Sequence, residues 1–472
     1  MIALSHRIAN QPRVPLGVLL LTLAVAGFGQ VLRVAETTVD QDPAGSAVGT
    51  TDAHLDTGAA PLLDPSVPTG GSASAERARI RDNVTFWGAR FAADPRDFIS
   101  ATRLAASEIE LARATGDVTA YLAAGEAVDG ALRAFPEYPV ALGYRGVVLV
   151  ALHRFEEARD QALAILAAAP GDPTALAILG DASLELGHVA AARTAYADLA
   201  ALGASPAASV RLSHLAFIEG RIAAAVLASE AAVSGAREQG LNGSVVAWYH
   251  YQLGDTRIAT GNRAGAAEAY RAALLADPAS HLARWGLSRI AAAEGRLDDA
   301  IAQLDAAIKI MPQLEFVARR ADLYRLRGAE DDTAREAADR ATVLAIAGLA
   351  AAAGTVHDRT LSLYLAGSGD DPARALSLAA AEIDIRPDVY GYDALAWALL
   401  ANDRPEEARV AMATALAFGT RDARLLYHAG MIALALGERR QAASLLRDAL
   451  DLDPSFDPLA VALASAVLAE LQ

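Results

Sequence analysis

Short apolar segments of helical length, separated by single glycines and prolines, fill the chain from about residue 139 to residue 456. The same residue type recurs after 34 positions at three pairs of sites: Gly146 and Gly180, Gly261 and Gly295, and Pro278 and Pro312. A typical unit holds two apolar segments, with a glycine after the first and a proline after the second. Glycine ends helices in a left-handed conformation, and proline cannot continue a helix. The pattern therefore predicts repeated pairs of helices and an all-α fold.

Glycines and alanines inside the segments indicate how the two helices of a unit pack. Gly254 and Gly430 lie in first helices, and Ala266 and Ala442 lie in the second helices of the same units. Larger side chains at these positions would push the helices apart. First helices are predicted to end at five glycines: Gly187, Gly220, Gly261, Gly295 and Gly437. Second helices are predicted to stop before five prolines: Pro170, Pro278, Pro312, Pro387 and Pro454.

The clearest single copy of the unit lies between Leu253 and Pro278. Its marker residues are Leu253, Gly254, Gly261, Ala266, Tyr270, Ala273 and Pro278. With several copies in register, the chain resembles the tetratricopeptide repeat family. The resemblance implies a right-handed superhelical solenoid of stacked antiparallel helix pairs, in which each pair covers the apolar face of the one before it.

The period divides residues 139–456 into nine units. Their expected bounds are 139–172, 173–205, 206–246, 247–280, 281–314, 315–355, 356–388, 389–422 and 423–456. Residues 75–138 are expected to form N-terminal helices and a degenerate first repeat, and residues 457–472 a closing helix.

Three features depart from the regular pattern. Unit 206–246 has 41 residues in place of 34, and unit 315–355 lacks the final proline, so we expect the superhelix to kink at both. The closing helix is more apolar than an end cap, which normally has a polar outer face. We therefore expect either an apolar outer side or a further element packed on it.

The N-terminal segment is directed to a membrane. Residues 14–32 carry no charge and lie between Arg13 and Arg33. This length leaves two alternatives open, a retained membrane anchor within residues 1–34 or a signal peptide cleaved after Ala26. Positive charge stays on the cytoplasmic side, so the body is predicted to be extracytoplasmic. Residues 35–74 are rich in Gly, Pro, Ser, Thr and Asp, which is typical of a disordered acidic linker.

Composition narrows the possible functions. Hydrophobic residues make up 53% of the chain and aromatic residues only 6%, so most of the apolar content is alanine and leucine, which favour helices. The net charge of -16 argues against a nucleic-acid partner, because phosphate binding depends on clustered basic residues. There is no cysteine. Lysine and arginine positions other than Lys309 are all arginine, and we interpret this bias as the signature of a GC-rich bacterial genome.

No motif in the chain points to catalysis. The histidines of the repeats are scattered singly, without the spacing of metal ligands. Acidic pairs such as Glu156-Glu157 and Glu406-Glu407 fall at the starts of second helices, where carboxylates interact favourably with the helix dipole. There is no phosphate-binding glycine loop and no nucleophile elbow. We expect a protein that is not an enzyme and that needs no cofactor or metal.

The family resemblance implies that first helices form the inner, concave wall, where binding residues would lie. Ten side chains are expected there: Asp181, His214, Trp248, Tyr251, Asp255, Trp285, Arg289, Arg319, Trp397 and Tyr427. Aromatic residues and arginine are common anchors of protein interfaces. Trp285 and Trp397 are equally expected to fill gaps between helices.

The predicted function is a scaffold that binds partner proteins or peptides and is tethered to, or exported across, the bacterial cytoplasmic membrane. Two alternatives remain open at this stage: a receptor for a soluble peptide or small molecule, and an accessory subunit of an envelope enzyme or transporter.

Overall fold

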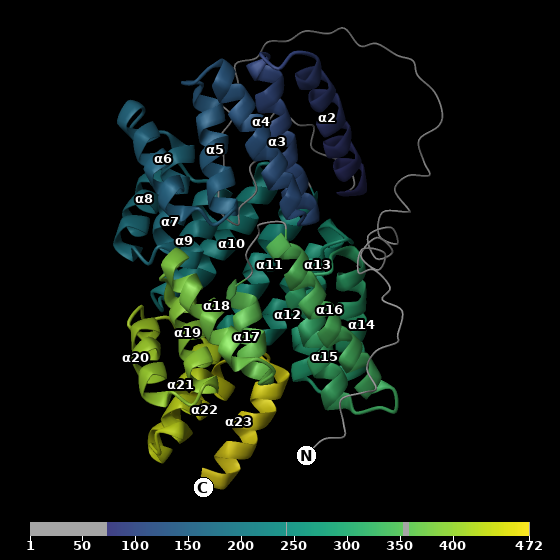
Figure 1. Cartoon of the computed structure of the whole chain (residues 1–472), viewed down its shortest axis with the longest axis vertical. Coiled ribbons are helices and arrows are strands. Elements are labelled where there is room, and N and C mark those ends of the chain that lie inside the picture. The colour runs from purple at the N-terminus through teal and green to yellow at the C-terminus, as the bar shows by residue number, and fades with distance from the viewer. Residues whose placement is uncertain (1–72, 242, 353–357, 472) are drawn as a thin grey trace, which may run out of the picture. The chain divides into compact units, whose positions relative to one another are not determined.

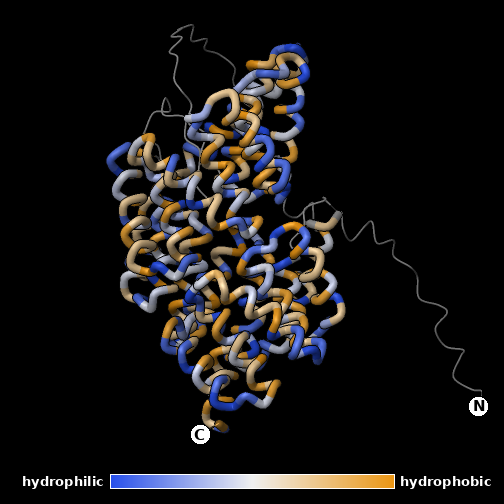
Figure 2. The backbone as a smooth tube through the Cα atoms, turned by 90° about the vertical axis from the view of Figure 1, so that its left-hand side faces the viewer, coloured by the Kyte–Doolittle hydropathy of each residue, from blue (hydrophilic) through white to orange (hydrophobic). Residues whose placement is uncertain are grey.

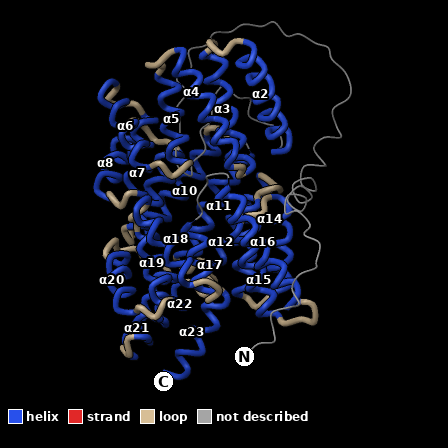
Figure 3. The backbone as a smooth tube through the Cα atoms, viewed as in Figure 1, coloured by secondary structure: helices blue, strands red, loops and turns tan. Residues whose placement is uncertain are grey.

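The computed structural model describes residues 73–241, 243–352 and 358–471, which form 22 helices and no strand (Figure 3). The helices are α2 (Ala73–Ala93), α3 (Phe98–Thr115), α4 (Val118–Ala134), α5 (Pro139–Ala151), α6 (Phe155–Ala168), α7 (Pro173–Glu185), α8 (Val189–Ala201), α9 (Pro206–Ile218), α10 (Ile222–Glu238), α11 (Gly243–Ala259), α12 (Arg263–Ala276), α13 (His281–Ala293), α14 (Leu297–Ile310), α15 (Leu314–Arg327), α16 (Asp332–Ala352), α17 (Asp358–Ser368), α18 (Pro372–Ile385), α19 (Val389–Ala401), α20 (Pro405–Leu416), α21 (Ala423–Ala435), α22 (Arg439–Leu452) and α23 (Pro458–Leu471).

Successive helices pack in pairs, and the second helix of most pairs packs against the first helix of the next pair (Figure 1). First helices also contact one another in series, from α5 through α7, α9 and α11 to α13. Hydrophobic and hydrophilic residues alternate along the helices (Figure 2), as expected where one face is buried and the other meets water. The predicted all-α fold of stacked helix pairs is confirmed.

The predicted helix ends are confirmed by the backbone. The five glycines expected to end first helices, Gly187, Gly220, Gly261, Gly295 and Gly437, have φ angles between 68° and 81°. The five prolines expected to stop second helices lie just beyond α6, α12, α14, α18 and α22. Aspartate or serine caps several first helices; Asp172, for example, accepts a hydrogen bond from the Ala175 backbone N–H at 2.8 Å.

Close packing within a pair requires glycine in the first helix. A Cβ atom at Gly254 would lie 2.3 Å from the ring of Tyr270, and one at Gly430 would lie 2.8 Å from Leu446. Ala266 and Ala442 on the facing helices are fully buried. The predicted close approach of the two helices is therefore confirmed.

The two irregular units behave differently from each other. The extra residues of unit 206–246 are taken up by α10 and α11, which have 17 residues each, and α10 still packs against α11. In contrast, α16 has 21 residues and makes little contact with α17, and the pair reaches α17 mainly through α15. The stacking nevertheless continues through side chains, because Val343 and Ala347 of α16 share a hydrophobic cluster with Leu361 and Leu365 of α17.

Helix pairs that are distant in sequence contact each other, because the superhelix returns on itself after about 200 residues. Thr420 donates a hydrogen bond of 2.6 Å to the carbonyl of Ile218, 202 positions away. Arg77 forms an ion pair with Asp277 at 3.0 Å, 200 positions away. Loop glycines of the first turn approach carbonyl groups of the second turn, the part of the chain from the end of α18 to the loop after α22. A Cβ atom at Gly187, for example, would lie 2.6 Å from the Pro387 oxygen. Successive turns therefore close over the inner wall.

The closing helix α23 packs on α22 and also reaches α15, near the start of the second half of the solenoid. Leu459, Ala460 and Leu463 line a cavity on its inner side. Leu463 keeps 46% of its surface exposed. The unusual apolar content of this helix therefore partly serves the wall of that cavity.

Some of the sequence predictions concern segments outside the described residues. These are the membrane-directed segment 14–32 and residues 35–72 of the predicted linker, whereas residues 73 and 74 begin α2. Within the described part of the chain, no helix combines the length and apolar character needed to cross a membrane.

Candidate ligand-binding cavities of the inner wall

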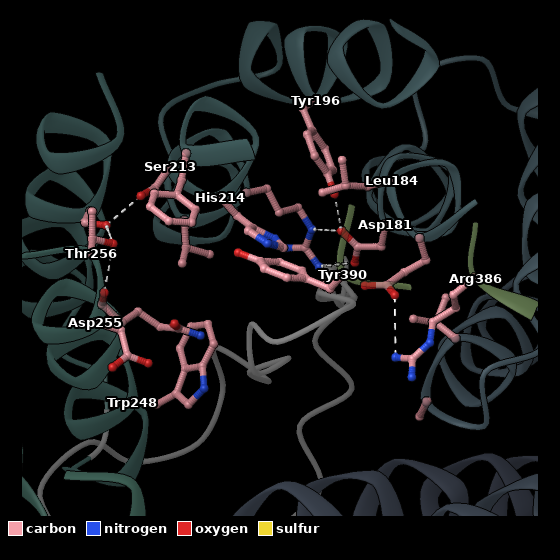
Figure 4. Close-up of a pocket in the computed structure, with 18 of the residues that line it drawn as sticks. Asp181, Leu184, Tyr196, Ser213, His214, Trp248, Asp255, Thr256, Arg386 and Tyr390 are labelled. Carbon is pink, nitrogen blue, oxygen red and sulfur yellow. Dashed lines mark hydrogen bonds and ion pairs between the residues drawn. The ribbon is translucent and has the colours of Figure 1, made fainter. Parts of the chain in front are cut away.

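Two cavities lie along the inner wall. Cavity 1, of about 600 Å³, is lined mainly by first helices α5, α7, α9, α11 and α13, with one residue each from α3, α4, α6, α8 and α10 (Figure 4). Arg386, Tyr390 and Asp422 of the second turn complete the lining. Cavity 2, of about 540 Å³, is lined by α15, α17, α19, α21 and α23, with Glu336 and Arg340 of α16. Both volumes are in the range of small-molecule and cofactor sites.

The structure brings most of the predicted wall residues to these two cavities. Cavity 1 receives five of them: Asp181, His214, Trp248, Asp255 and Arg289. Cavity 2 receives three: Arg319, Trp397 and Tyr427. Tyr251 and Trp285 are not part of either lining. Trp285 is 6% exposed and stacks on Phe316 with 5.3 Å between ring centres, so it fills a gap between helices.

One buried polar cluster of cavity 1 centres on Asp181. Its carboxylate accepts hydrogen bonds of 2.9 and 2.8 Å from Nε and Nη2 of Arg211, and one of 2.7 Å from the Tyr196 hydroxyl. The side chains of Arg211 and Asp181 are 4% and 8% exposed. Such a bidentate pair ties α7 to α9, and removing either partner would leave a buried charge.

A second cluster joins the two turns. Asp255 accepts hydrogen bonds from the Tyr270 hydroxyl at 2.6 Å and from Arg289 Nη1 at 3.2 Å. The other guanidinium nitrogen of Arg289, Nη2, lies 3.3 Å from Asp453 of the second turn. Arg289 therefore holds one edge of cavity 1 to the C-terminal part of the solenoid.

A chain of hydroxyl groups forms the side of cavity 1 between α9 and α11. Ser213 and Ser229 lie 2.6 Å apart, and Ser229 lies 3.0 Å from Thr256. Thr256 also donates to the Gln252 carbonyl at 2.9 Å. These hydroxyls are satisfied within the protein and fix the spacing of α9, α10 and α11.

His214 and Glu185 face the cavity with shifted pKa values. The His214 ring has open surface that faces the cavity, and its enclosed position lowers its pKa, so the ring is neutral at pH 7. Burial and the nearby Asp388 raise the pKa of Glu185 to about 7. Cavity 1 therefore contains one carboxyl group that is only partly ionised at neutral pH.

Cavity 2 combines ion pairs with an aromatic stack. Arg319 Nη1 lies 2.7 Å from Asp457, the residue before α23. Trp397 stacks on His428 at 4.1 Å between ring centres, and His428 Nδ1 lies 2.6 Å from Asp393. The rings and charges of α19 and α21 thus form a rigid side of the cavity.

Two polar side chains of cavity 2 lack full compensation for their burial by hydrogen bonds or opposite charges. Burial raises the pKa of Asp322 to about 7, despite the attraction of Arg319 at 3.6 Å. The Tyr364 hydroxyl is buried and has no hydrogen-bond partner among the described residues.

Sequence reasoning missed several cavity residues. Glu185 lies one helical turn after Asp181, so the spacing of four residues could have placed it on the same face. Arg386 and Tyr390 come from the second turn, and nothing in the repeat pattern indicates that this turn returns to cavity 1. Among the described residues, no group of three or more His, Asp or Glu side chains is arranged to hold a metal ion.

Models of the tetratricopeptide repeat match residues 109–173, 251–315 and 423–456. These segments include helix pairs of both turns, from α5–α6 to α21–α22. The chain therefore contains tetratricopeptide repeats, as its 34-residue period predicted.

Three solved structures are similar to the chain at 13–22% sequence identity. The crystal structure of MamA is 22% identical, with 35% of this chain and 93% of that chain covered and a TM-score of 0.29. A human IFIT1 dimer with PPP-AAAA is 14% identical, with coverage of 74% and 83% and a TM-score of 0.43. Yeast Tom70 is 13% identical, with coverage of 84% and 93% and a TM-score of 0.33. No curated protein sequence matches the chain.

Proposed function

We propose that this repeat protein is a binding scaffold that holds a short peptide segment of a partner protein in the cavities of its inner wall. The observation that carries the proposal is the convergence of Asp181, His214 and Trp248, from three successive first helices, on one cavity (Figure 4). Aromatic rings and ion-paired carboxylates suit the mixed chemistry of a peptide. Because successive turns contact each other, an extended segment fits this wall better than a folded surface.

The test is retention of peptides by the full-length chain. A positional-scanning pentapeptide library is applied to the immobilised protein, and the affinity of the best peptide is measured by calorimetry. Trp248→Ala removes an aromatic wall of cavity 1 and is expected to weaken binding at least tenfold, since buried aromatic anchors carry much of the binding energy. The control is Trp87→Ala on α2, which lines neither cavity.

Equal losses for Trp248→Ala and Trp87→Ala would place the binding surface elsewhere. If no peptide is retained by the wild-type chain, the proposed function is wrong.

A receptor for a small molecule is a second candidate, favoured by the volumes of about 600 and 540 Å³. A small molecule at a hundred times its Kd would add about 2.7 kcal/mol to the free energy of unfolding, which a thermal-shift screen detects. Stabilisation by a small molecule without retention of any peptide would favour this candidate.

We further propose that the chain works by binding alone and outside the cytoplasm of a bacterium, tethered or exported through residues 14–32. The support is the uncharged stretch between Arg13 and Arg33. The chain has no cysteine, so Ser74→Cys creates a single labelling site. We expect a membrane-impermeant maleimide to label it in cells with a permeabilised outer membrane.

Fractionation of the same cells distinguishes a retained anchor from a cleaved signal peptide. A protein that stays in the membrane pellet after an alkaline wash has a retained anchor, and a soluble, shortened protein has lost a cleaved signal. A full-length protein that is protected from the maleimide would contradict the proposed location.

A further inference from the structure

Glu185 lies in cavity 1 with an incomplete set of hydrogen-bond partners. It is the last residue of α7, where the negative end of the helix dipole disfavours a carboxylate. Its Oε2 atom is buried and has no hydrogen-bond partner among the described residues. The nearest cationic atom is Nη1 of Arg386, at 3.7 Å, which is too far for a hydrogen bond.

Arg386 is already engaged by a different carboxylate. Its Nε atom donates a hydrogen bond of 2.5 Å to Oε1 of Glu382, one turn earlier in α18, and its Nη2 atom pairs with the same oxygen. The neighbouring cation, Arg359, lies 3.2 Å from Glu382 and 2.6 Å from Asp388. Both guanidinium groups attract the Glu185 carboxylate, but no hydrogen bond joins either of them to it.

Two other arginines of cavity 1 are held by acids. Arg211 is bound in a bidentate pair by Asp181, and Arg289 lies between Asp255 and Asp453. Cavity 1 therefore contains a carboxylate with a buried oxygen that accepts no hydrogen bond, and its ion-pair partner Arg386 is bound more tightly by Glu382. A ligand with a positively charged hydrogen-bond donor would give the Glu185 carboxylate the hydrogen bond that it lacks.

The side chains that line cavity 1 near Glu185 are compatible with a cationic group. Figure 4 shows His214 and Tyr390 in the middle of the view, between Trp248 and Arg386. A neutral imidazole does not repel a cation, and aromatic rings attract one over their faces. An amine or guanidinium entering between these rings would meet no uncompensated positive charge from His214.

We propose that cavity 1 recognises a cationic group of its peptide, a protonated amine or a guanidinium, which donates a hydrogen bond to the Glu185 carboxylate. This inference rests on the proposed function, because it names the chemistry of the peptide that the inner wall binds. A free N-terminus and a lysine or arginine side chain carry the same chemistry and are separated by the test.

Binding of such a group is coupled to protonation. The charged and titratable groups around Glu185 are Asp181 of its own helix, Tyr196 of α8, Arg359 of α17, and Arg386 and Asp388 between α18 and α19. With a pKa of about 7, Glu185 carries about half a proton at pH 7. A cation beside it favours the ionised form, so binding releases up to about half a proton.

The experiment uses three pentapeptide pools and the full-length chain. The pools are random at four positions and carry Lys or Arg, Asp or Glu, or norleucine and citrulline at the centre, each with a free or an acetylated N-terminus. We expect the cationic pool to be retained at least tenfold more than the neutral pool, with Glu185→Gln abolishing the difference. Glu268→Gln, on the exposed face of α12, is the matched control and should behave as wild type.

Calorimetry of the best peptide in two buffers with different ionisation enthalpies then measures the proton released at pH 7. We expect release from the wild type and none from Glu185→Gln, a difference that a merely structural role of Glu185 would not produce. If only free N-termini confer retention, the cation is the terminal amine; if acetylated Lys peptides bind equally, it is the side chain.

The outcomes separate the two proposals. Equal retention of neutral and cationic pools by wild type, with no proton release, overturns the role of Glu185 and leaves peptide binding standing. A preference for the acidic pool also overturns it. If no pool is retained, both proposals fail together.

Discussion

Cavities 1 and 2 have similar linings but differ in what closes them. Each combines aromatic rings with Arg–carboxylate pairs, and each contains a carboxyl group, Glu185 or Asp322, whose pKa burial raises to about 7. Cavity 1 is closed by loops of the second superhelical turn, whereas cavity 2 is closed by the terminal helix α23. One wall is therefore formed by helix pairs of the solenoid, and the other by the single helix α23 that packs on α22 and α15.

The ion pairs of the two cavities reflect this difference. The side chains of Arg211 and Asp181 in cavity 1 are 4% and 8% exposed, while those of Arg319 and Asp457 in cavity 2 are 14% and 29% exposed. A fully buried pair leaves an unpaired charge when one partner is lost, whereas water compensates much of the loss at a more exposed pair. We therefore expect the first cavity to depend on its ion pair for stability and the second to be more easily opened.

The largest expected effect comes from Asp181→Asn. The substitution removes the negative charge beside buried Arg211 and should lower the free energy of unfolding by about 3–5 kcal/mol, measured by urea denaturation. The matched change in cavity 2, Asp457→Asn, should cost much less. Combining Asp181→Leu with Arg211→Met should restore most of the stability, because no buried charge then remains.

Equal costs for Asp181→Asn and Asp457→Asn would remove the proposed difference between the cavities.

A smaller difference is expected between two glycines that face the second helices. A Cβ atom at Gly254, beside cavity 1, would lie 2.3 Å from the rigid ring of Tyr270, whereas one at Gly430 would lie 2.8 Å from the end of the flexible Leu446 side chain. Gly254→Ala should cost about 1–3 kcal/mol by overpacking, and Gly430→Ala should cost less because leucine can change rotamer. Thermal unfolding of both variants checks the order, and a larger loss for Gly430→Ala would contradict it.

Much of the local fold could be predicted because a few residues determine the structure of each repeat. Gly187 and Gly220 end helices through positive φ angles, and Gly254 marks a close approach of two helices. These are constraints that a short segment imposes on itself or on its nearest neighbour. The same logic could not predict how far the superhelix winds before it meets itself, because that depends on small rotations summed over many pairs.

The candidate site shows the same limit. Asp181, His214 and Trp248 share a wall because first helices lie side by side, and the period predicts this arrangement. Arg386 joins them only because the second turn contacts the first, so no local pattern indicated it. Trp285 shows the opposite case, since its place in a first helix gave no information on whether the ring would face the cavity or Phe316.

Opening of cavity 2 can be measured at α23. Asp457→Asn weakens the 2.7 Å contact with Arg319, while asparagine can still cap α23 by accepting from the Ala460 backbone N–H. A loss of about 1 kcal/mol in local stability would make amide hydrogen exchange of α23 about fivefold faster. Asp451→Asn on the exposed face of α22 is the control. Unchanged exchange in α23 would show that the ion pair does not hold this helix in place.

The dependence of stability on pH tests whether each cavity contains a carboxylate that is unfavourable in its ionised form. The folded state raises the pKa of Glu185 from 4.5 to about 7, so it binds more protons than the unfolded chain between these values. Stability from this group is therefore present at low pH and is lost as pH rises through 7. Glu185→Gln does not titrate, so its stability relative to wild type should rise between pH 5 and pH 8. The pKa shift sets the size of this rise at up to about 2.5 kcal/mol, because one pKa unit corresponds to about 1.4 kcal/mol. Asp322→Asn should show the same trend in cavity 2, and the control Glu268→Gln should show no change with pH. The measurement is the thermal unfolding midpoint of each variant and of wild type at pH 5 and pH 8. If the difference between Glu185→Gln and wild type is the same at both pH values, the Glu185 carboxylate is already compensated in the folded protein.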